Sequence, residues 1–481
     1  MNLKVEINRL QTGIPGLDKV LGGGLPEFSF NLLAGPPGCG KTTFAHQLMF
    51  ALATSERPAL YFMIGGETPL KMFRYQQQFD FFRPREIQHS IHFVNLAMEG
   101  SVDHAGEFLK RIAAAVESHK PAFVFVDSIR SILPAIATDN TSANSPQYFM
   151  EQLGMLLTSW QATTFLVGEY DSDSEGNAVV SSADGLIWLR QSVHRDSVIR
   201  KLEIVKMRGQ PVLPGLHAFR INQAGIEVFP PASLSHSEFL SSTVALEETR
   251  LALGVPALDA MLGGGLPRGY SLLVAGPSGS GKTLLAAAFL SEGNRVGEGG
   301  IFVSFEPHPN RSYPAALRQL IEANRVGVVV GHSADLSIDE IVVLIKKEVE
   351  RRGATRIVID SLSSFELAVA PAFRSDFRES FSRLIGSLAN LGLSVLIICE
   401  LDDRFTDLRF SPYGTAFMTD AIIIQRYFER KSRLLRIISV IKVRGSAHSN
   451  ELREYSIGDN GICIGEMLPD VEGILRGQAR L

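Results

Sequence analysis

The chain carries the stretch Gly35-Pro36-Pro37-Gly38-Cys39-Gly40-Lys41-Thr42, which returns near its middle as Gly276-Pro277-Ser278-Gly279-Ser280-Gly281-Lys282-Thr283. The same lead-in precedes both copies. It reads LDKVLGGGLP over residues 17–26 and LDAMLGGGLP over residues 258–267. Matched motifs after matched lead-ins are too specific to arise by chance. They predict a duplicated domain with two phosphate-binding loops, and therefore two sites for a nucleoside triphosphate.

The length and composition suit two globular domains. The chain has 481 residues, of which 45% are hydrophobic and 20% are charged. Its formal net charge of −4 provides no basic footprint for nucleic acid. No apolar run is long enough to span a membrane, and the amino terminus has no signal core, so we expect a cytoplasmic protein. The cysteines are too few for a disulfide framework and lack metal-ligand spacing; they are Cys39, Cys399 and Cys463.

The duplication continues well beyond the two loops. The strand-like run ending at Asp127-Ser128 matches the run ending at Asp360-Ser361. The copies are separated by a stretch rich in proline and serine, residues 229–237, which is a poor helix or strand former. We therefore expect a first domain over residues 1–235 and a second over residues 247–481.

Short apolar runs alternate with helical patterns in both copies. Such alternation predicts an α/β fold, in which a mostly parallel sheet is flanked by helices and ligands bind at the carboxyl ends of the strands. The expected helices after the loops are Thr42–Ala53 and Thr283–Gly293. The expected strands are Leu32–Ala34, Leu60–Ile64 and Thr163–Val167 in the first copy, and Leu272–Ala275, Ile301–Phe305 and Ser394–Ile398 in the second.

The loop pattern itself assigns contacts to ATP or ADP. Its glycines allow backbone N–H groups to converge on phosphate oxygens at the start of a helix, and its lysine should neutralise the β- and γ-phosphates. The predicted nucleotide-binding residues are Gly35, Gly38, Gly40, Lys41, Thr42 and Thr43 in the first copy, and Gly276, Ser278, Gly279, Ser280, Gly281, Lys282, Thr283 and Leu284 in the second.

Two threonines and two aspartates are the predicted ligands of Mg²⁺. Thr42 and Thr283 follow the loop lysines, and their hydroxyls should bind the ion. Asp127 and Asp360 end apolar strands, where a carboxylate can hold Mg²⁺ directly or through a bound water. Either aspartate alone could be a turn or helix-cap residue, but their matched positions favour the metal site.

A carboxylate that activates water is expected just beyond the strand that follows the first helix. The second copy offers Glu306 at that position. In the first copy we interpret Gly66 as its counterpart, so Glu67 follows one residue late. A slip of one residue at a strand end can turn a side chain away, which leaves Glu67 either a weaker base or a solvated surface carboxylate. We therefore expect two unequal sites.

Paired cations recur near the end of each copy. Lys206 and Arg208, like Lys442 and Arg444, end late apolar strands just before a glycine. Residues spaced i, i+2 on a strand point the same way, so each pair could reach a phosphate on a neighbouring subunit. A solvated strand end is the alternative, and recurrence in both copies favours the catalytic role.

These motifs together resemble the KaiC family, the double-domain RecA-like ATPases of the cyanobacterial clock and their bacterial relatives. The resemblance implies two tandem RecA-like P-loop domains. It also implies a homo-hexameric double ring with Mg·ATP between subunits, and a protein signalling partner such as a kinase or clock-type regulator. Its amino-terminal ring would be an ATPase and its carboxyl-terminal ring an autokinase and autophosphatase. The resemblance rests on the LGGGLP lead-ins, both loops, Gly66-Glu67-Thr68-Pro69, Asp127-Ser128, Asp360-Ser361-Leu362 and both K-x-R-G stretches.

The chain departs from the family pattern in two places. Of the family's paired glutamates, Gly66 replaces the first in copy one and Pro307 replaces the second in copy two. The family's adjacent phosphoacceptors fall where this chain has Ala416-Phe417, which carry no hydroxyl. We therefore expect hydrolysis rather than the usual autophosphorylation. The nearby hydroxyls are those of Ser411, Thr415 and Thr419.

Two other classes of function remain open from the sequence. A RecA- or DnaB-like DNA motor would bind DNA in a salt-dependent way, although the acidic balance and the lack of a Lys/Arg–aromatic loop argue against it. A structural ATP-binding scaffold would assemble with ATP without turnover, and Gly66 keeps that alternative open for the first domain.

Overall fold

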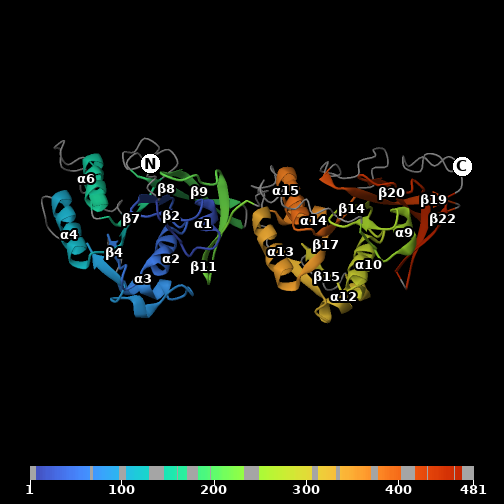
Figure 1. Cartoon of the computed structure of the whole chain (residues 1–481), viewed down its shortest axis with the longest axis horizontal. Helices are drawn as coiled ribbons and strands as arrows, with labels where there is room; N and C mark the ends of the chain where they lie inside the picture. Colours follow the sequence, from blue (N-terminus) through green and yellow to red (C-terminus); the bar gives the residue numbers. More distant parts are fainter. Residues whose placement is uncertain are drawn as a thin grey trace, which may run out of the picture. The chain divides into compact units, whose positions relative to one another are not determined.

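The structure is a computed structural model. The chain divides into two compact units, Met1–Pro231 and Ala232–Leu481, and the division falls inside the proline- and serine-rich stretch (Figure 1). The described residues are 7–64, 69–96, 104–128, 146–159, 161–170, 183–194, 197–231, 249–305, 313–331, 336–369, 377–401, 418–430, 432–459 and 461–468.

The described residues of the first unit form a nine-stranded sheet, in the order β11-β10-β9-β8-β3-β7-β6-β4-β5. The strands from β8 to β5 in this order run parallel, and β9, β10 and β11 continue the sheet antiparallel. The strands are β3 (Phe30–Gly35), β4 (Ala59–Met63), β5 (Ile91–Asn95), β6 (Phe123–Asp127), β7 (Thr163–Glu169), β8 (Gly185–His194), β9 (Ser197–Met207), β10 (Leu216–Asn222) and β11 (Gly225–Phe229), beside a small pair, β1 (Arg9–Leu10) and β2 (Leu25–Pro26).

Helices cover both faces of this sheet. On one face Phe44 of α2 belongs to a core cluster with Phe125, and on the other Phe108 of α4 belongs to a cluster with Val124. Successive residues of a strand point to opposite faces, which is why an unbroken apolar strand can serve both clusters. The helices are α1 (Leu17–Val20), α2 (Lys41–Leu52), α3 (Pro69–Gln76), α4 (His104–His119) and α6 (Pro146–Ser159), with a 3₁₀ turn, η1 (Pro84–Glu86).

The second unit repeats this plan. Its described residues form a nine-stranded sheet in the order β16-β15-β17-β18-β14-β19-β20-β21-β22, in which the last three strands are antiparallel. The strands are β14 (Ser271–Gly276), β15 (Gly299–Ser304), β16 (Val326–Val330), β17 (Ala354–Asp360), β18 (Ser394–Glu400), β19 (Ala421–Arg430), β20 (Arg433–Val443), β21 (Arg453–Gly458) and β22 (Gly461–Met467), beside β12 (Arg250–Leu251) and β13 (Leu266–Pro267).

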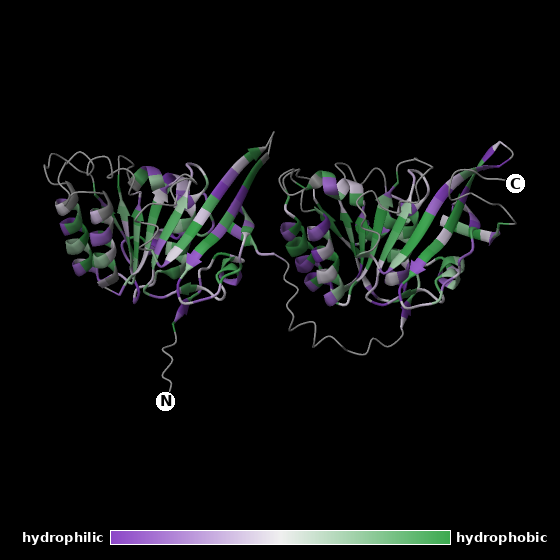
Figure 2. Cartoon of the chain, turned by 90° about the horizontal axis from the view of Figure 1, so that it is seen from above, coloured by the Kyte–Doolittle hydropathy of each residue, from purple (hydrophilic) through white to green (hydrophobic). Residues whose placement is uncertain are grey.

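Its helices also pack on both faces of the sheet. Phe289 of α10 and Leu317 of α12 share one core cluster, and Ile341 of α13, Phe365 of α14 and Phe381 of α15 share the other. Figure 2 shows the pattern as hydrophobic central strands flanked by helices of mixed hydropathy. The helices are α9 (Pro256–Met261), α10 (Lys282–Arg295), α12 (Ala315–Glu322), α13 (Ile338–Arg352), α14 (Leu362–Ala368) and α15 (Phe377–Asn390).

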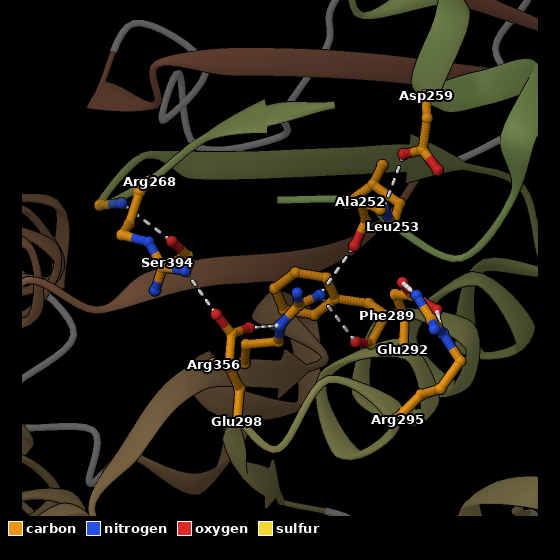
Figure 3. A network of polar contacts seen from close by, with 11 residues as sticks. Ala252, Leu253, Asp259, Arg268, Phe289, Glu292, Arg295, Glu298, Arg356 and Ser394 are labelled. Atoms are coloured by element: carbon orange, nitrogen blue, oxygen red, sulfur yellow. Dashed lines mark hydrogen bonds and ion pairs between the residues drawn. The ribbon is translucent and has the colours of Figure 1, made fainter. Parts of the chain in front are cut away.

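A buried arginine joins three elements of the second unit. Arg356 of β17 is 2% exposed, and its Nε donates to Glu298 Oε2 at 2.6 Å. Its Nη1 donates to the carbonyl oxygens of Ala252 and Phe289, so it ties the chain after β12 and helix α10 to the sheet (Figure 3). Burial alone would raise the pKa of Glu298, but hydrogen bonds from Arg268 and Arg356 outweigh it and hold that pKa below its usual value.

The predicted fold class is confirmed: the chain has two tandem RecA-like domains, each with a mostly parallel sheet flanked by helices. The predicted helix bounds need small corrections. The first helix spans Lys41–Leu52, and the second extends to Arg295, because an arginine in the last turn can continue the helix beyond Gly293.

Candidate nucleotide sites

Each phosphate loop connects the central strand of its sheet to a helix, β3 to α2 and β14 to α10. Gly40 and Gly281 precede these helices with φ values of 105° and 94°, in the left-handed region that favours glycine. A Cβ on Gly40 would lie 2.6 Å from Ile221 Cδ1, and one on Gly281 would lie 2.9 Å from Ile457 Cδ1. The two glycines therefore meet the same steric requirement in both copies.

The start of each helix is arranged to receive an anion. The first N–H groups of a helix have no partner within the helix and carry partial positive charge. Within the described residues, no side chain caps α2 at Gly40 or α10 at Gly281. The loop in front of each helix can therefore direct these donors toward phosphate oxygens.

The loop lysines fold back over their own loops. Lys41 Nζ donates to the carbonyl oxygens of Gly35 and Pro36, at 2.9 and 2.8 Å, and Lys282 Nζ donates to those of Gly276 and Pro277, at 2.9 and 2.7 Å. Both side chains are buried. Burial lowers the pKa of Lys282, although the charges of Glu400 and Asp360 oppose that shift. An anion bound beside this ammonium would favour its charged form.

The predicted magnesium ligands meet in both copies. Thr42 Oγ1 donates to Asp127 Oδ2 at 2.9 Å, and Thr283 Oγ1 donates to Asp360 Oδ2 at 3.0 Å. A hydroxyl beside one carboxylate fits Mg²⁺, which keeps several waters and commonly binds one or two carboxylates together with substrate phosphates. Among the described residues no cluster of three or more His, Cys, Asp or Glu side chains could hold a metal by itself.

A second carboxylate flanks each loop, and it is not among the residues expected from the motifs. Glu169 ends β7 opposite Gly35, and Glu400 ends β18 opposite Gly276. The signal was present, because both acids end apolar strands as Asp127 and Asp360 do. These carboxylates add negative charge at the edge of the sheet where the phosphate loops lie.

The two loops differ in how the sheet supports them. In the second domain, the hydroxyl of Tyr455 donates to the carbonyl oxygen of Ser280 at 2.5 Å, and that of Tyr427 donates to Ser278 at 3.3 Å. Ser280 Oγ donates to Gln425 Oε1 at 3.0 Å. Strand register places other side chains at the matching positions of the first domain, so its loop has a different set of supports. The counterparts of Tyr455, Tyr427 and Gln425 are, respectively, Phe219, Gln191 and Leu189.

The cations of the K-x-R-G stretches lie near aspartates that precede β8 and β19. Arg208 pairs with Asp184 at 3.1 Å, and Arg444 pairs with Asp420 at 3.4 Å. The two arginine side chains are 60% and 61% exposed. Lys206 Nζ donates to the carbonyl oxygen of Ala183 at 2.6 Å. Burial, together with the charge of the neighbouring arginine, lowers the pKa of both Lys206 and Lys442.

These cations lie at the wrong end of the sheet for their own phosphate loops. The backbone N–H of Arg208 binds Asp184, and that of Asp184 binds Phe30, the first residue of β3. The loop begins at the other end of this strand, about 17 Å away at about 3.3 Å per residue. Arg444, Asp420 and Ser271 repeat this arrangement in the second domain. A phosphate that these cations bind must therefore come from outside their own domain's site.

The two candidate bases, Glu67 and Glu306, lie outside the described residues. The strands before them correct one alignment. Met63 pairs with Asp127 as Ser304 pairs with Asp360. Glu306 stands two residues beyond Ser304, so its counterpart is Gly65 rather than Gly66. Glu67 therefore lies two residues beyond the position that matches Glu306, because the alignment is counted from the matched strand ends, Met63 and Ser304.

The region expected to hold phosphoacceptors is only partly described. Ser411, Thr415, Ala416 and Phe417 lie outside the described residues. Thr419 is fully buried and precedes Asp420, which binds the first residue of β14. The hydroxyl of Thr419 therefore lies at the far end of β14 from the second phosphate loop.

Cys39, Cys399 and Cys463 are free, the first two buried and the third exposed. Within the described part of the chain, no helix is both long enough and apolar enough to cross a bilayer.

Comparison with known proteins gives a consistent result. The family model described as "ATPase: KaiC" matches residues 10–233 and again residues 251–468. A circadian clock oscillator protein KaiC from Rippkaea orientalis is 25% identical, covering 99% of this chain and 92% of the relative. The KaiC of Prochlorococcus marinus is 24% identical, with 98% and 96% covered, and that of Synechococcus elongatus is 25% identical, with 98% and 92% covered.

Proposed function

The chain belongs to the KaiC family of ATPases, and from this premise we propose that it is a homo-hexameric double ring that hydrolyses Mg·ATP between subunits. The observation that carries the proposal is the distance between the K-x-R-G cations and their own phosphate loops. These cations recur in both domains, yet each pair lies at the opposite end of the central strand from its loop. In a ring, one subunit can present that end to the loop of the next.

We assign the following roles to the described residues. The glycines of each loop and the start of each helix bind phosphate, and Lys41 and Lys282 neutralise it. Thr42 with Asp127, and Thr283 with Asp360, would hold Mg²⁺, which neutralises phosphate charge and orients the phosphates when bound. The cations of the neighbouring subunit, Lys206 with Arg208 and Lys442 with Arg444, stabilise the charge that develops during phosphoryl transfer.

Turnover is proposed to be unequal between the two domains. Glu306 orients or activates water in the second site, whereas Gly65 occupies the matching position in the first. We place the modules at residues 1–235 and 247–481. In the second module hydrolysis is the main reaction, because Ala416 and Phe417 replace the usual phosphoacceptors.

Nucleotide state is proposed to be read by another protein. The curated relatives are named circadian clock oscillator proteins, which makes a kinase or a clock-type regulator the kind of partner to seek. DNA is not expected as a partner, because the net charge of −4 gives the chain no basic footprint.

Particle mass and phosphate release test this proposal together. The full chain should form a hexamer with Mg·ATP and smaller species without nucleotide, and it should release phosphate at a rate that DNA does not change. Assembly without turnover would indicate a scaffold, and DNA-stimulated turnover would indicate a motor. A monomer under both conditions would overturn the proposal.

Autophosphorylation is tested separately. Incubation with Mg·ATP followed by mass spectrometry of residues 405–425 should find no stoichiometric phosphate. Stoichiometric phosphate on Ser411, Thr415 or Thr419 would show that kinase activity has moved to a different acceptor.

A further inference from the structure

The magnesium carboxylate of the first site receives an additional hydrogen bond. The hydroxyl of Tyr61, on β4, donates to Asp127 Oδ2 at 2.7 Å. The same oxygen accepts a hydrogen bond from Thr42 Oγ1 at 2.9 Å. Two donors from different elements, β4 and α2, therefore converge on one carboxylate oxygen at the end of β6. Such contacts set the rotation of a carboxylate about its Cβ–Cγ bond.

The ring of Tyr61 is held on several sides. Tyr61 is buried, and its ring centroid lies 4.7 Å from that of His46, 5.4 Å from that of Phe93 and 6.0 Å from that of Phe125. A ring packed in this way has little rotational freedom to lose when its hydroxyl orients a ligand. The position of the donor is thus built into the core of the domain.

His46 adds no positive charge beside this contact at neutral pH. It is buried, and burial lowers its pKa to about 4. A side-chain hydrogen bond with Gln76 opposes this shift but does not outweigh it. A cation beside the site would repel a bound Mg²⁺, so the neutral imidazole adds no charge that opposes metal binding.

The second domain has different residues at both positions. Tyr61 pairs with Phe125, two residues before Asp127, and Phe302 pairs with Val358, two residues before Asp360. Phe302 is therefore the counterpart of Tyr61, and it has no hydroxyl to donate. Ala287 stands five residues after Lys282, as His46 stands five residues after Lys41. The contact from Tyr61 to Asp127 therefore cannot be repeated by the matching residue, Phe302.

We propose that Tyr61 is a positioning residue for Asp127 and that it strengthens Mg²⁺ binding at the first site. This inference rests on the proposed function, in which Asp127 is a magnesium carboxylate. Hydrogen bonds that orient a ligating carboxylate are commonly worth 10- to 100-fold in metal affinity. The tyrosine would thereby favour a first site that retains its nucleotide.

The test uses the full chain with Lys282→Ala, so that nucleotide binding reports the first site. A fluorescent ATP analogue is bound in EDTA, and Mg²⁺ is then titrated to find the concentration that gives half-maximal binding. Tyr61→Phe should raise this concentration about 10-fold and leave the affinity without Mg²⁺ unchanged. The matched control is Tyr170→Phe, because Tyr170 is buried in the other core cluster of the same domain. It should leave both quantities unchanged.

The outcomes separate this inference from the proposal beneath it. An unchanged Mg²⁺ midpoint in Tyr61→Phe would overturn the role of Tyr61 alone. A loss of affinity without Mg²⁺ would also overturn it, because that result indicates damage to the phosphate loop or the fold. If the Lys282→Ala parent shows no Mg²⁺-dependent binding at all, the proposed nucleotide site itself is wrong.

Discussion

Tyr455 donates its hydroxyl to the carbonyl oxygen of Ser280 across 2.5 Å, which joins strand β21 to the second phosphate loop. Burial raises the pKa of Tyr455, so the phenol stays protonated and remains a donor. The contact joins residues distant in sequence and holds the loop in place before a phosphate binds. Without it, the loop would become ordered only on binding. Support of this kind reduces the conformational entropy lost on binding.

Removing this hydroxyl should weaken nucleotide binding at the second site. Tyr455→Phe keeps the ring but deletes one hydrogen bond, worth about 1 kcal/mol, or about a 5-fold loss in affinity. The measurement is titration of Mg·ATP analogue in a Lys41→Ala chain. Tyr170→Phe, a buried tyrosine of the first domain, is the control. Equal affinities for Tyr455→Phe and its parent would show that the bond does not organise the loop.

Loss of the buried arginine should destabilise the second domain. Arg356→Met leaves Glu298 paired with Arg268 alone, and removing one member of a buried ion pair costs about 3 kcal/mol or more in unfolding free energy. Arg351→Met is the matched control, because its pair with Glu348 is exposed and should be worth less than about 1 kcal/mol. Urea unfolding would compare them, and similar shifts for both variants would contradict this account of Arg356.

His46 should make the first domain sensitive to acid. Its pKa is about 4 when folded, against 6.5 for an ordinary histidine. Between these pH values the unfolded chain binds more protons, so the folded state loses up to about 3 kcal/mol as pH falls through this window. His46→Leu should flatten the dependence of the urea midpoint on pH between 6.5 and 4. The same slope in variant and parent would show that another group is responsible.

The candidate bases should contribute unequally to turnover. Glu306→Gln should lower phosphate release by about 100-fold or more, as expected when a general base is removed. Glu67→Gln should have a smaller effect, because counting from the matched strand ends makes Gly65, and not Glu67, the counterpart of Glu306. Steady-state phosphate release of the two variants provides the comparison. A larger loss of phosphate release in Glu67→Gln than in Glu306→Gln would mean that Glu67 reaches the attacking water despite its shifted position.

The chemistry of the loops could be predicted because it depends on short, local patterns. Gly40, Lys41 and Thr42 adopt their positions through the backbone of one loop, and Asp127 was recognisable as the end of an apolar strand. The hydrogen bonds from Tyr61 to Asp127 and from Tyr455 to Ser280 could not be predicted, because each joins parts of the chain that are far apart in the sequence. Their partners depend on register and sheet order, which no local pattern contains.

The K-x-R-G cations illustrate the same division. Their residue types and their recurrence predicted a phosphate contact in trans, but their distance from their own loop required the topology. That distance follows from β8 pairing parallel with β3 and β9 returning antiparallel. The aspartate partners, Asp184 and Asp420, also emerged only from this pairing.

A mixed-subunit assay tests the central claim, that each site is completed by a neighbouring chain. One variant carries Lys282→Ala, which disables its loop but leaves Arg444 intact, and the other carries Arg444→Ala, which leaves its loop intact. Both also carry Lys41→Ala to silence the first domain. Each variant alone should release little phosphate.

An equal mixture assembled with Mg·ATP should recover turnover at about a quarter of its second-domain sites, because an intact loop then meets an intact arginine by random arrangement around a ring. Phosphate release no higher than that of the separate variants would contradict the account, since it would place Arg444 outside the site of its neighbour.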